Sequence, residues 1–134
     1  MTNPTDLTQL IHLAITARQK AYAPYSKFKV GAVLRGESGT IYTGCNVENA
    51  AYPASICAER TALVKAISEG ETKFDVLIVA TETAGTPCGV CRQMLYEFAV
   101  GLRVIIVDLH GAVHHDMTLS ELLPHGFGSD SLNE

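Results

Sequence analysis

The chain has 134 residues, of which 47% are hydrophobic and 18% are charged, a composition that suits one folded domain over residues 1–134. Its net charge of -4 argues against a protein that binds nucleic-acid backbones, because that function needs clustered Lys and Arg. The N-terminus lacks the pattern of a secretion signal, and no apolar run approaches the roughly 18 residues that span a bilayer. We therefore expect a soluble cytoplasmic protein with a small-molecule ligand and no nucleic-acid or membrane partner.

The first predicted element is an amphipathic helix over residues 6–21. Apolar side chains recur at helical spacing in its first half, and Asp6 and Gln9 are placed as a capping pair at its start. Pro24 disfavours a helical conformation at the residue before it. The helix should therefore end before Pro24, and a sheet should begin beyond it.

Two β-rich runs follow, at residues 27–34 and 40–47, with two glycines in the loop between them, so we expect an antiparallel hairpin. The later helices and strands alternate, and they are predicted at residues 58–68, 76–80, 91–98, 104–107, 112–116 and 119–123. Alternation of this kind indicates an α/β fold, a three-layer α/β/α sandwich built on a mixed sheet of roughly five strands.

Three of the four cysteines fall at the predicted starts of two helices. Cys57 precedes one helix, and Cys88 and Cys91 belong to the start of the next. Free backbone N–H groups and the helix dipole favour thiolates over thiols at such ends. A structural zinc ion is usually closed by four protein ligands, whereas a hydrolytic zinc ion keeps one position open for water. Three cysteines therefore predict a working zinc ion.

Glu59 follows Cys57 by two residues and supplies a carboxylate that zinc does not need as a ligand. A carboxylate beside a zinc-activated water can accept its proton and later deliver protons to a substrate. Residues two apart on a regular helix do not share a face, so Cys57 and Glu59 converge only if the first turn is irregular. Zinc with three thiolates carries a net charge of about -1. We expect the helix ends, together with Arg60 and Arg92, to offset that charge.

Residues 57–60 (Cys-Ala-Glu-Arg) and 87–93 (Pro-Cys-Gly-Val-Cys-Arg-Gln) resemble the signatures of the zinc-dependent cytidine deaminases. The similarity extends over nearly the whole chain, from residues 22–28 through 44–50 to 121–124. It implies hydrolytic deamination of cytidine and deoxycytidine to uridine and deoxyuridine, with release of ammonia, in pyrimidine salvage. It also implies one zinc ion per subunit.

The resemblance assigns a role to each residue of the two signatures. Cys57, Cys88 and Cys91 would bind the zinc ion. Glu59 would be the proton shuttle, which protonates N3 of the base while a zinc-activated water attacks C4. Ammonia would then leave from a tetrahedral intermediate.

A substrate-binding set is implied in the same way. Alternation along the second predicted strand places Asn46 and Glu48 on one face and leaves Cys45 on the other, away from the metal. In similar enzymes the asparagine and glutamate at these positions hold the ribose hydroxyls. Phe28, expected on the neighbouring strand, resembles the aromatic residue that packs against the pyrimidine. The backbone N–H of Ala58 should meet an oxygen of the base, as it does in the family.

Phe127 resembles a phenylalanine that reaches the active site of a neighbouring subunit. Relatives of this length with three cysteines are typically homotetramers, so a homotetramer is expected here. The chain also departs from the family pattern. The loop at residues 80–86 is short, Thr86 stands where serine is common, and Val90 replaces the more usual alanine. These changes bear on the pocket wall and the subunit contacts rather than on the ligands.

Two alternatives remain open from the sequence. One is a deaminase of the same superfamily that acts on a nucleoside antibiotic, a nucleotide or a base in nucleic acid. The acidic net charge and the pair of Asn46 and Glu48 favour a free nucleoside over these substrates. The other is a non-catalytic module in which zinc only holds two helices to the sheet, and it requires a fourth protein ligand.

Overall fold

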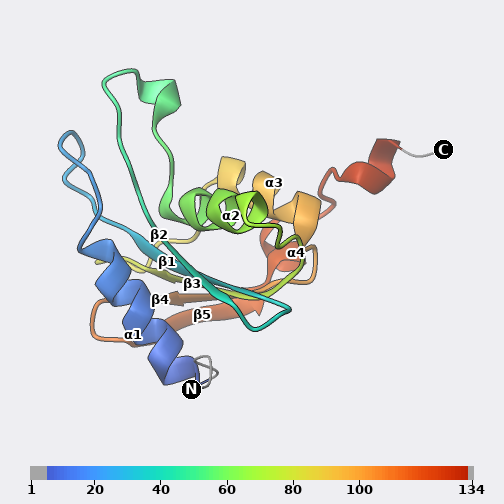
Figure 1. Ribbon diagram of the computed structural model, residues 1–134, viewed down its shortest axis with the longest axis horizontal. Helices are drawn as coiled ribbons and strands as arrows, with labels where there is room; N and C mark the ends of the chain where they lie inside the picture. The colour runs from blue at the N-terminus through green and yellow to red at the C-terminus, as the bar shows by residue number, and fades with distance from the viewer. Residues whose placement is uncertain (1–5, 133–134) are drawn as a thin grey trace.

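The computed structural model describes residues 6–132 and has a five-stranded sheet at its centre (Figure 1). The strands are β1 (Gly31–Gly36), β2 (Ile41–Cys45), β3 (Phe74–Ala80), β4 (Arg103–Val107) and β5 (Val113–Thr118). Their order across the sheet is β2-β1-β3-β4-β5, and only β3 and β4 run parallel. The sheet is therefore mixed, as predicted.

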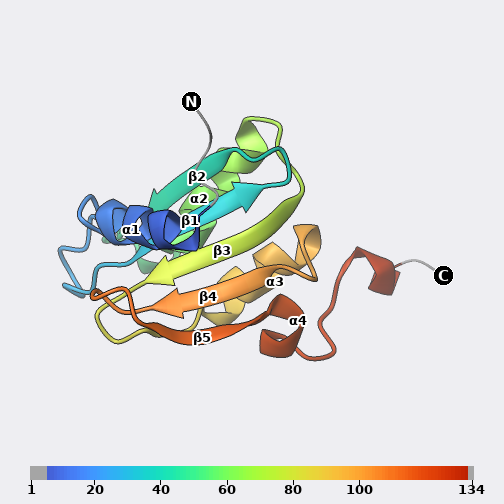
Figure 2. The ribbon, with the colours of Figure 1, turned by 90° about the horizontal axis from the view of Figure 1, so that it is seen from below.

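Helices cover both faces of this sheet (Figures 1 and 2). They are α1 (Leu7–Arg18), α2 (Ala58–Ser68), α3 (Gly89–Phe98) and α4 (Leu119–Leu122), with short 3-10 turns at Tyr52–Ala54 and Ser129–Leu132. One apolar core lies between α1 and one face of the sheet, and a larger one packs α2, α3 and α4 against the other face. The predicted three-layer α/β/α sandwich is confirmed. No helix between residues 6 and 132 combines the length and the apolar character needed to cross a bilayer.

The predicted start of the first strand is wrong by four residues. Lys27 has a φ of 61°, a left-handed conformation that a strand does not accommodate. The side-chain oxygen of Asn46 then accepts the N–H of Val30, so a side chain stands where a ladder bond would be. As a result β1 begins at Gly31, and Phe28 lies in an extended segment before it rather than on a strand.

Other boundaries move for similarly local reasons. The helix α1 ends at Arg18, before the predicted residue 21, and it is capped by the Asp6 side chain, which accepts the N–H of Thr8. The strand β5 extends to Thr118, beyond the predicted residue 116. Thr118 then caps α4 in a capping box with Glu121, so the strand passes directly into the helix.

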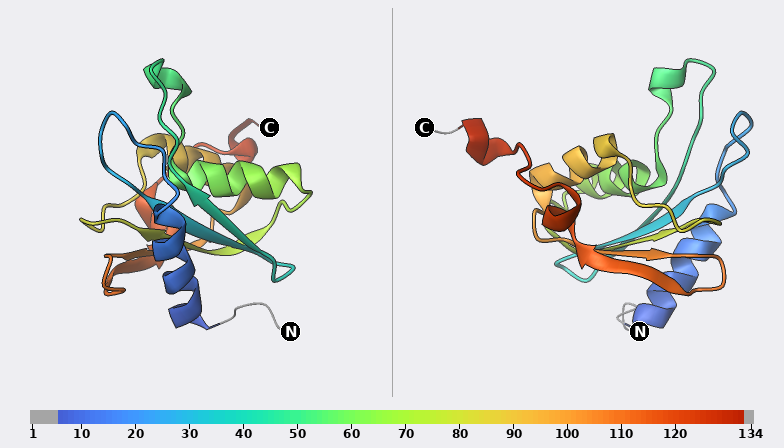
Figure 3. Two further views of the ribbon diagram at one scale, coloured as in Figure 1. Left: turned by 60° about the vertical axis from the view of Figure 1, so that its left-hand side comes forward. Right: turned by 180° about the vertical axis from the view of Figure 1, so that it is seen from behind.

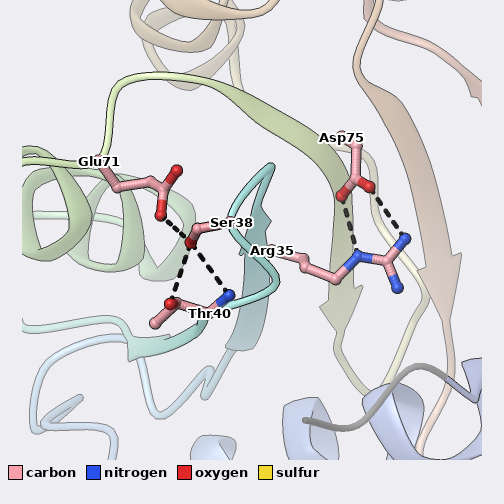
Figure 4. Close-up of polar contacts among 5 residues, drawn as sticks. All are labelled: Arg35, Ser38, Thr40, Glu71 and Asp75. Atoms are coloured by element: carbon pink, nitrogen blue, oxygen red, sulfur yellow. Dashed lines mark hydrogen bonds and ion pairs between the residues drawn. The ribbon is translucent and has the colours of Figure 1, made fainter.

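The turn of the β1–β2 hairpin is fixed at the end of the sheet where α2 finishes (Figure 4). The Ser38 hydroxyl bonds to the carboxylate of Glu71, which follows α2, and to the hydroxyl of Thr40 3.0 Å away. Arg35 pairs through two nitrogens with Asp75 on β3, at 2.9 and 3.1 Å. The three cysteines lie at the other end of α2. The contacts that fix the hairpin turn therefore do not occupy the end of the sheet that is near the cysteines.

Candidate active site

A pocket of about 630 Å³ opens where the first turns of α2 and α3 meet the segments that flank β1 and β2. Two loops stand side by side at this end of the sheet, one leading into β1 and the other following β2 (Figures 1 and 3). Nine of the residues singled out in the sequence line this pocket: Phe28, Asn46, Glu48, Cys57, Glu59, Arg60, Thr86, Cys88 and Val90. The topology thus gathers residues that are far apart in the sequence.

The sulfurs of Cys57, Cys88 and Cys91 form a cluster in which all ligand atoms lie within 4.8 Å of one another. The Cys57 and Cys88 sulfurs are 3.7 Å apart, and the Cys88 and Cys91 sulfurs are 3.5 Å apart. Two thiolates bound tetrahedrally to zinc, at Zn–S distances of about 2.3 Å, would be separated by about 3.8 Å. The cluster therefore has the spacing and the donor atoms for a zinc ion.

Local backbone geometry aims these thiols at one point. Cys57 and Cys88 are the N-cap residues of α2 and α3, both in an extended conformation, and neither side chain caps its own helix. Cys91 lies in the first turn of α3 and is fully buried. The start of α2 approaches β2 very closely. A Cβ added to Gly44 on β2 would lie only 2.4 Å from the carbonyl oxygen of Ala58. Only glycine permits that approach.

Glu59 turns into the pocket rather than toward solvent, and its residue is only 4% exposed. It can share the pocket with Cys57 because Cys57 lies outside the helix as the N-cap, where helical spacing does not apply. Burial raises the pKa of Glu59 to about 7, and the charge of Cys57 adds to this, while its own backbone N–H and Arg60 oppose it. A carboxyl group with this pKa can take up and release a proton near neutral pH.

Hydrogen bonds within the cluster shift the pKa values of two of its thiols in opposite directions. The pKa of Cys57 is lowered to about 5, first by a hydrogen bond from Cys91 and then by Arg60 and Cys88. The pKa of Cys91 is raised, chiefly because its thiol donates to Cys57 and because it is buried. The Nη2 of Arg60 lies 3.7 Å from the Cys57 sulfur. Arg60 therefore lies beside the Cys57 thiol, and its role in offsetting the charge of the zinc cluster stays a prediction.

Arg92 has different neighbours from those expected. Its guanidinium donates to the carbonyl oxygens of Pro87 and Leu122, each at 2.7 Å, and to the hydroxyl of Thr86 at 2.9 Å. None of these hydrogen bonds reaches a sulfur. A role for Arg92 in offsetting the charge of the zinc cluster therefore stays a prediction.

Asn46 and Glu48 both line the pocket, while Cys45 is neither among the lining residues nor part of the thiol cluster. Asn46 and Glu48 lie just beyond the end of β2 rather than on it. Asn46 is 8% exposed; its oxygen accepts the N–H of Val30 at 2.9 Å, and its amide donates to the carbonyl of Phe28 at 2.8 Å. Asn46 therefore fixes the segment that carries Phe28.

Glu48 holds the same segment further from the sheet. Its carboxylate accepts the N–H groups of Tyr25 and Ser26, at 3.0 and 3.1 Å, and the hydroxyl of Ser26. These bonds, led by that of the Ser26 hydroxyl, lower the pKa of Glu48. The Ser26 oxygen also accepts the N–H of Phe28 at 3.0 Å. Ser26 was missed from the sequence, although a hydroxyl two residues before Phe28 is a known turn signal.

The remaining predicted residues occupy distinct places. Phe28 is 39% exposed on the wall of the pocket, and Ala58 is a buried residue that opens α2 beside Cys57. Phe127 is 57% exposed and is not among the residues that line the pocket. It lies in the segment between α4 and the 3-10 turn at Ser129–Leu132. Gln93 on α3 donates to its carbonyl oxygen at 2.8 Å.

Comparison with known proteins gives a consistent result. Residues 4–107 match the sequence model of the cytidine and deoxycytidylate deaminase zinc-binding region, a span that contains all three cysteines of the cluster. The chain is 47% identical over 131 residues to a cytidine deaminase of Sporosarcina psychrophila, with 96% of each chain covered. It is 42% identical over 132 residues to that of Halalkalibacterium halodurans, covering 96% of this chain and 99% of the relative.

Solved structures agree with the sequence comparison. The cytidine deaminase from Burkholderia pseudomallei superposes with a TM-score of 0.84 at 45% identity, covering 89% of this chain and 97% of the other. The cytidine deaminase from Mycobacterium tuberculosis gives a TM-score of 0.79 at 34% identity, with 93% and 99% covered. The fold, the zinc cofactor and the resemblance read from the sequence are confirmed. The chain belongs to the family of zinc-binding cytidine and deoxycytidylate deaminases.

Proposed function

We propose that this chain deaminates cytidine and deoxycytidine hydrolytically, giving uridine and deoxyuridine with release of ammonia. The observation that carries the proposal is a cluster of three thiols at zinc spacing beside a pocket that Cys57, Cys88 and the buried carboxyl of Glu59 line. The relatives at 42% and 47% identity, both named cytidine deaminases, support it over nearly the full length.

Each residue of the cluster has a defined task in this proposal. Cys57, Cys88 and Cys91 would hold the zinc ion, which when bound makes a water molecule acidic enough to act as a nucleophile. Glu59 takes the proton that this water loses and delivers it to N3 of the pyrimidine. Its pKa of about 7 suits both transfers, because the group is neither a strong acid nor fully protonated near neutral pH.

The ribose is bound, in this proposal, by Asn46 and Glu48. A carboxylate offers about four lone-pair sites. Glu48 uses three of them on Tyr25 and Ser26, so one remains for a sugar hydroxyl. Asn46 likewise retains one amide hydrogen and one lone pair beyond its bonds to Phe28 and Val30. The same two residues would therefore shape the Phe28 wall and bind the sugar.

We further propose that the chain, as one deaminase domain over residues 1–134, works as a cytoplasmic homotetramer in pyrimidine salvage. Phe127 would enter the pocket of a neighbouring subunit. Its exposure and its absence from the lining of its own pocket support this assignment. Tyr52, beside the pocket mouth, is 76% exposed and would also be covered in an assembly.

The test is turnover of cytidine, followed by the fall in ultraviolet absorbance, with zinc content measured on the same samples. The wild type should convert cytidine, and Glu59→Ala should retain its zinc while losing activity. Conversion of cytidine by Glu59→Ala at the wild-type rate would show that Glu59 is not the proton shuttle.

Two further outcomes separate the alternatives. Activity on deoxycytidylate but not on deoxycytidine would identify a nucleotide deaminase instead. A purely structural zinc site would need a fourth protein ligand. Within residues 6–132, no further His, Cys, Asp or Glu joins the three thiols, which supports an open coordination position.

A further inference from the structure

The loop that leads to Cys88 has few attachments of its own. Residues 82–87 take part in three hydrogen bonds. One runs from the N–H of Gly85 to the Thr81 hydroxyl, and the other two are donated by Arg92 to Thr86 and Pro87. Most of the polar support of this loop thus comes from one side chain.

Arg92 connects this loop to a distant part of the chain. Its third hydrogen bond goes to the carbonyl of Leu122, the last residue of α4, which is one of the carbonyls that a helix end leaves without a partner. The distances of 2.7 Å to Leu122 and to Pro87 are short, as expected when the donor is charged. Three acceptors from two segments therefore converge on one guanidinium.

The geometry requires arginine rather than any cation. A guanidinium presents its donors as a rigid planar fork, whereas a Lys ammonium is a compact point charge on a flexible stem. Pro87 directly precedes Cys88, and Arg92 directly follows Cys91. Holding the Pro87 carbonyl therefore limits how Cys88 can move relative to Cys91.

We propose that Arg92 is a positioning residue for the metal centre. By fixing the carbonyl of Pro87 and anchoring it to the end of α4, Arg92 keeps the sulfurs of Cys88 and Cys91 at the spacing that zinc requires. This inference rests on the proposed function, since it assumes that the cluster holds zinc. It differs from the expectation that Arg92 acts through its charge.

Zinc release from the intact protein to a coloured chelator tests this inference with a readout other than activity. Arg92→Gln and Arg92→Lys should both release zinc about tenfold faster than the wild type, in line with other changes around metal ligands. Thr86→Val, which removes only one of the three hydrogen bonds, should have a smaller effect, roughly threefold. Circular dichroism should show that each variant is folded at the temperature of the assay.

A cobalt-substituted sample supplies a spectroscopic signature of the ligand geometry. The visible bands of Arg92→Gln and Arg92→Lys should shift relative to those of the wild type, because their positions depend on the arrangement of the ligands. Arg103→Gln is the matched control. Arg103 is the first residue of β4, at the end of the sheet away from the cysteines, and its guanidinium pairs with Asp116. Zinc release and cobalt bands of this variant should match those of the wild type.

Wild-type release and unchanged cobalt bands in both Arg92 variants would overturn the inference. A normal Arg92→Lys beside an impaired Arg92→Gln would also overturn it, since charge alone would then suffice. If neither Arg92 variant folds, Thr86→Val decides, and a wild-type rate of release from it would count against positioning. Turnover of cytidine by the wild type tests the proposed function separately, so the two can fail independently.

Discussion

The starts of α2 and α3 are built alike, yet they do different work. Each begins with a cysteine N-cap in an extended conformation. Three residues after the N-cap, α2 has Arg60, whose Nη2 lies 3.7 Å from the Cys57 sulfur. At the same position α3 has Cys91, whose sulfur lies 3.5 Å from that of Cys88. In both helix starts the side chain three positions after the N-cap is the one that meets the N-cap sulfur.

The next position shows the same division. Four residues after its N-cap, α3 has Arg92, which reaches the carbonyls of Pro87 and Leu122 instead of a sulfur. The corresponding residue of α2 is Thr61, whose hydroxyl donates to the Cys57 carbonyl at 3.2 Å. Arg60, three residues after its N-cap, thus contacts a sulfur, whereas Arg92, four residues after its N-cap, binds backbone carbonyls.

The largest contrast is expected at the position two residues after each N-cap, which is Glu59 in α2 and Val90 in α3. Glu59→Gln should lower kcat about 10²–10⁴-fold, because it removes the proposed proton carrier while keeping the shape of the side chain. Val90→Thr, a substitution of similar volume on the same pocket, should leave kcat near that of the wild type. Cytidine turnover at matched zinc content measures both, and equal losses would contradict the division between the two helix starts.

The two arginines should respond differently to the same substitutions. Arg60→Gln should lower kcat about tenfold, since Cys57 loses the charge beside its sulfur. Arg60→Lys should recover part of that loss, because a positive charge remains. If Arg60→Lys were as impaired as Arg60→Gln, the guanidinium of Arg60 would act by its shape, as proposed for Arg92, and the contrast would disappear.

Variants outside both helix starts should affect binding rather than turnover. Ser26→Ala removes the hydroxyl that joins Glu48 to the backbone of Phe28, so KM for cytidine should rise roughly threefold with little change in kcat. Ser38→Ala is the matched control, because the Ser38 hydroxyl bonds to Glu71 and Thr40 at the other end of the sheet. A fall in kcat for Ser26→Ala with unchanged KM would place Ser26 in the chemical step.

The smallest effect is expected at Thr61. Thr61→Val deletes one partly buried hydrogen bond, so the free energy of unfolding in urea should fall by about 0.5–1.5 kcal/mol. Zinc release should stay close to the wild-type rate, because the Cys57 carbonyl is also held by the N–H of Thr61. Release as fast as that expected for Arg92→Gln would mean that the two positions are equivalent after all.

The sequence predicts the elements of this site better than their connections. Cys57, Cys88 and Cys91 stand out because few arrangements other than a metal centre need three cysteines at helix starts, and the structure brings their sulfurs together. The alternation of helices and strands likewise predicts the layered fold. Both signals are local or periodic, and a single sequence carries such signals directly.

Contacts between distant segments are not visible in this way. The bond from Arg92 to Leu122 joins residues 30 positions apart, and nothing in either neighbourhood indicates it. The predicted start of β1 is wrong for the same reason. The side chain of Asn46, which follows β2, accepts the N–H of Val30 in place of a backbone carbonyl of a neighbouring strand. Side chains that replace backbone partners are determined by tertiary packing, which periodicity does not encode.

The proposed function requires three thiolates that hold zinc and leave its fourth position open beside Glu59. X-ray absorption at the zinc edge of the purified protein reports these ligands. We expect three sulfur neighbours at about 2.3 Å and one oxygen neighbour that an added nucleoside analogue perturbs. Four sulfurs, or a fourth protein ligand that no analogue perturbs, would contradict it and leave a structural zinc site.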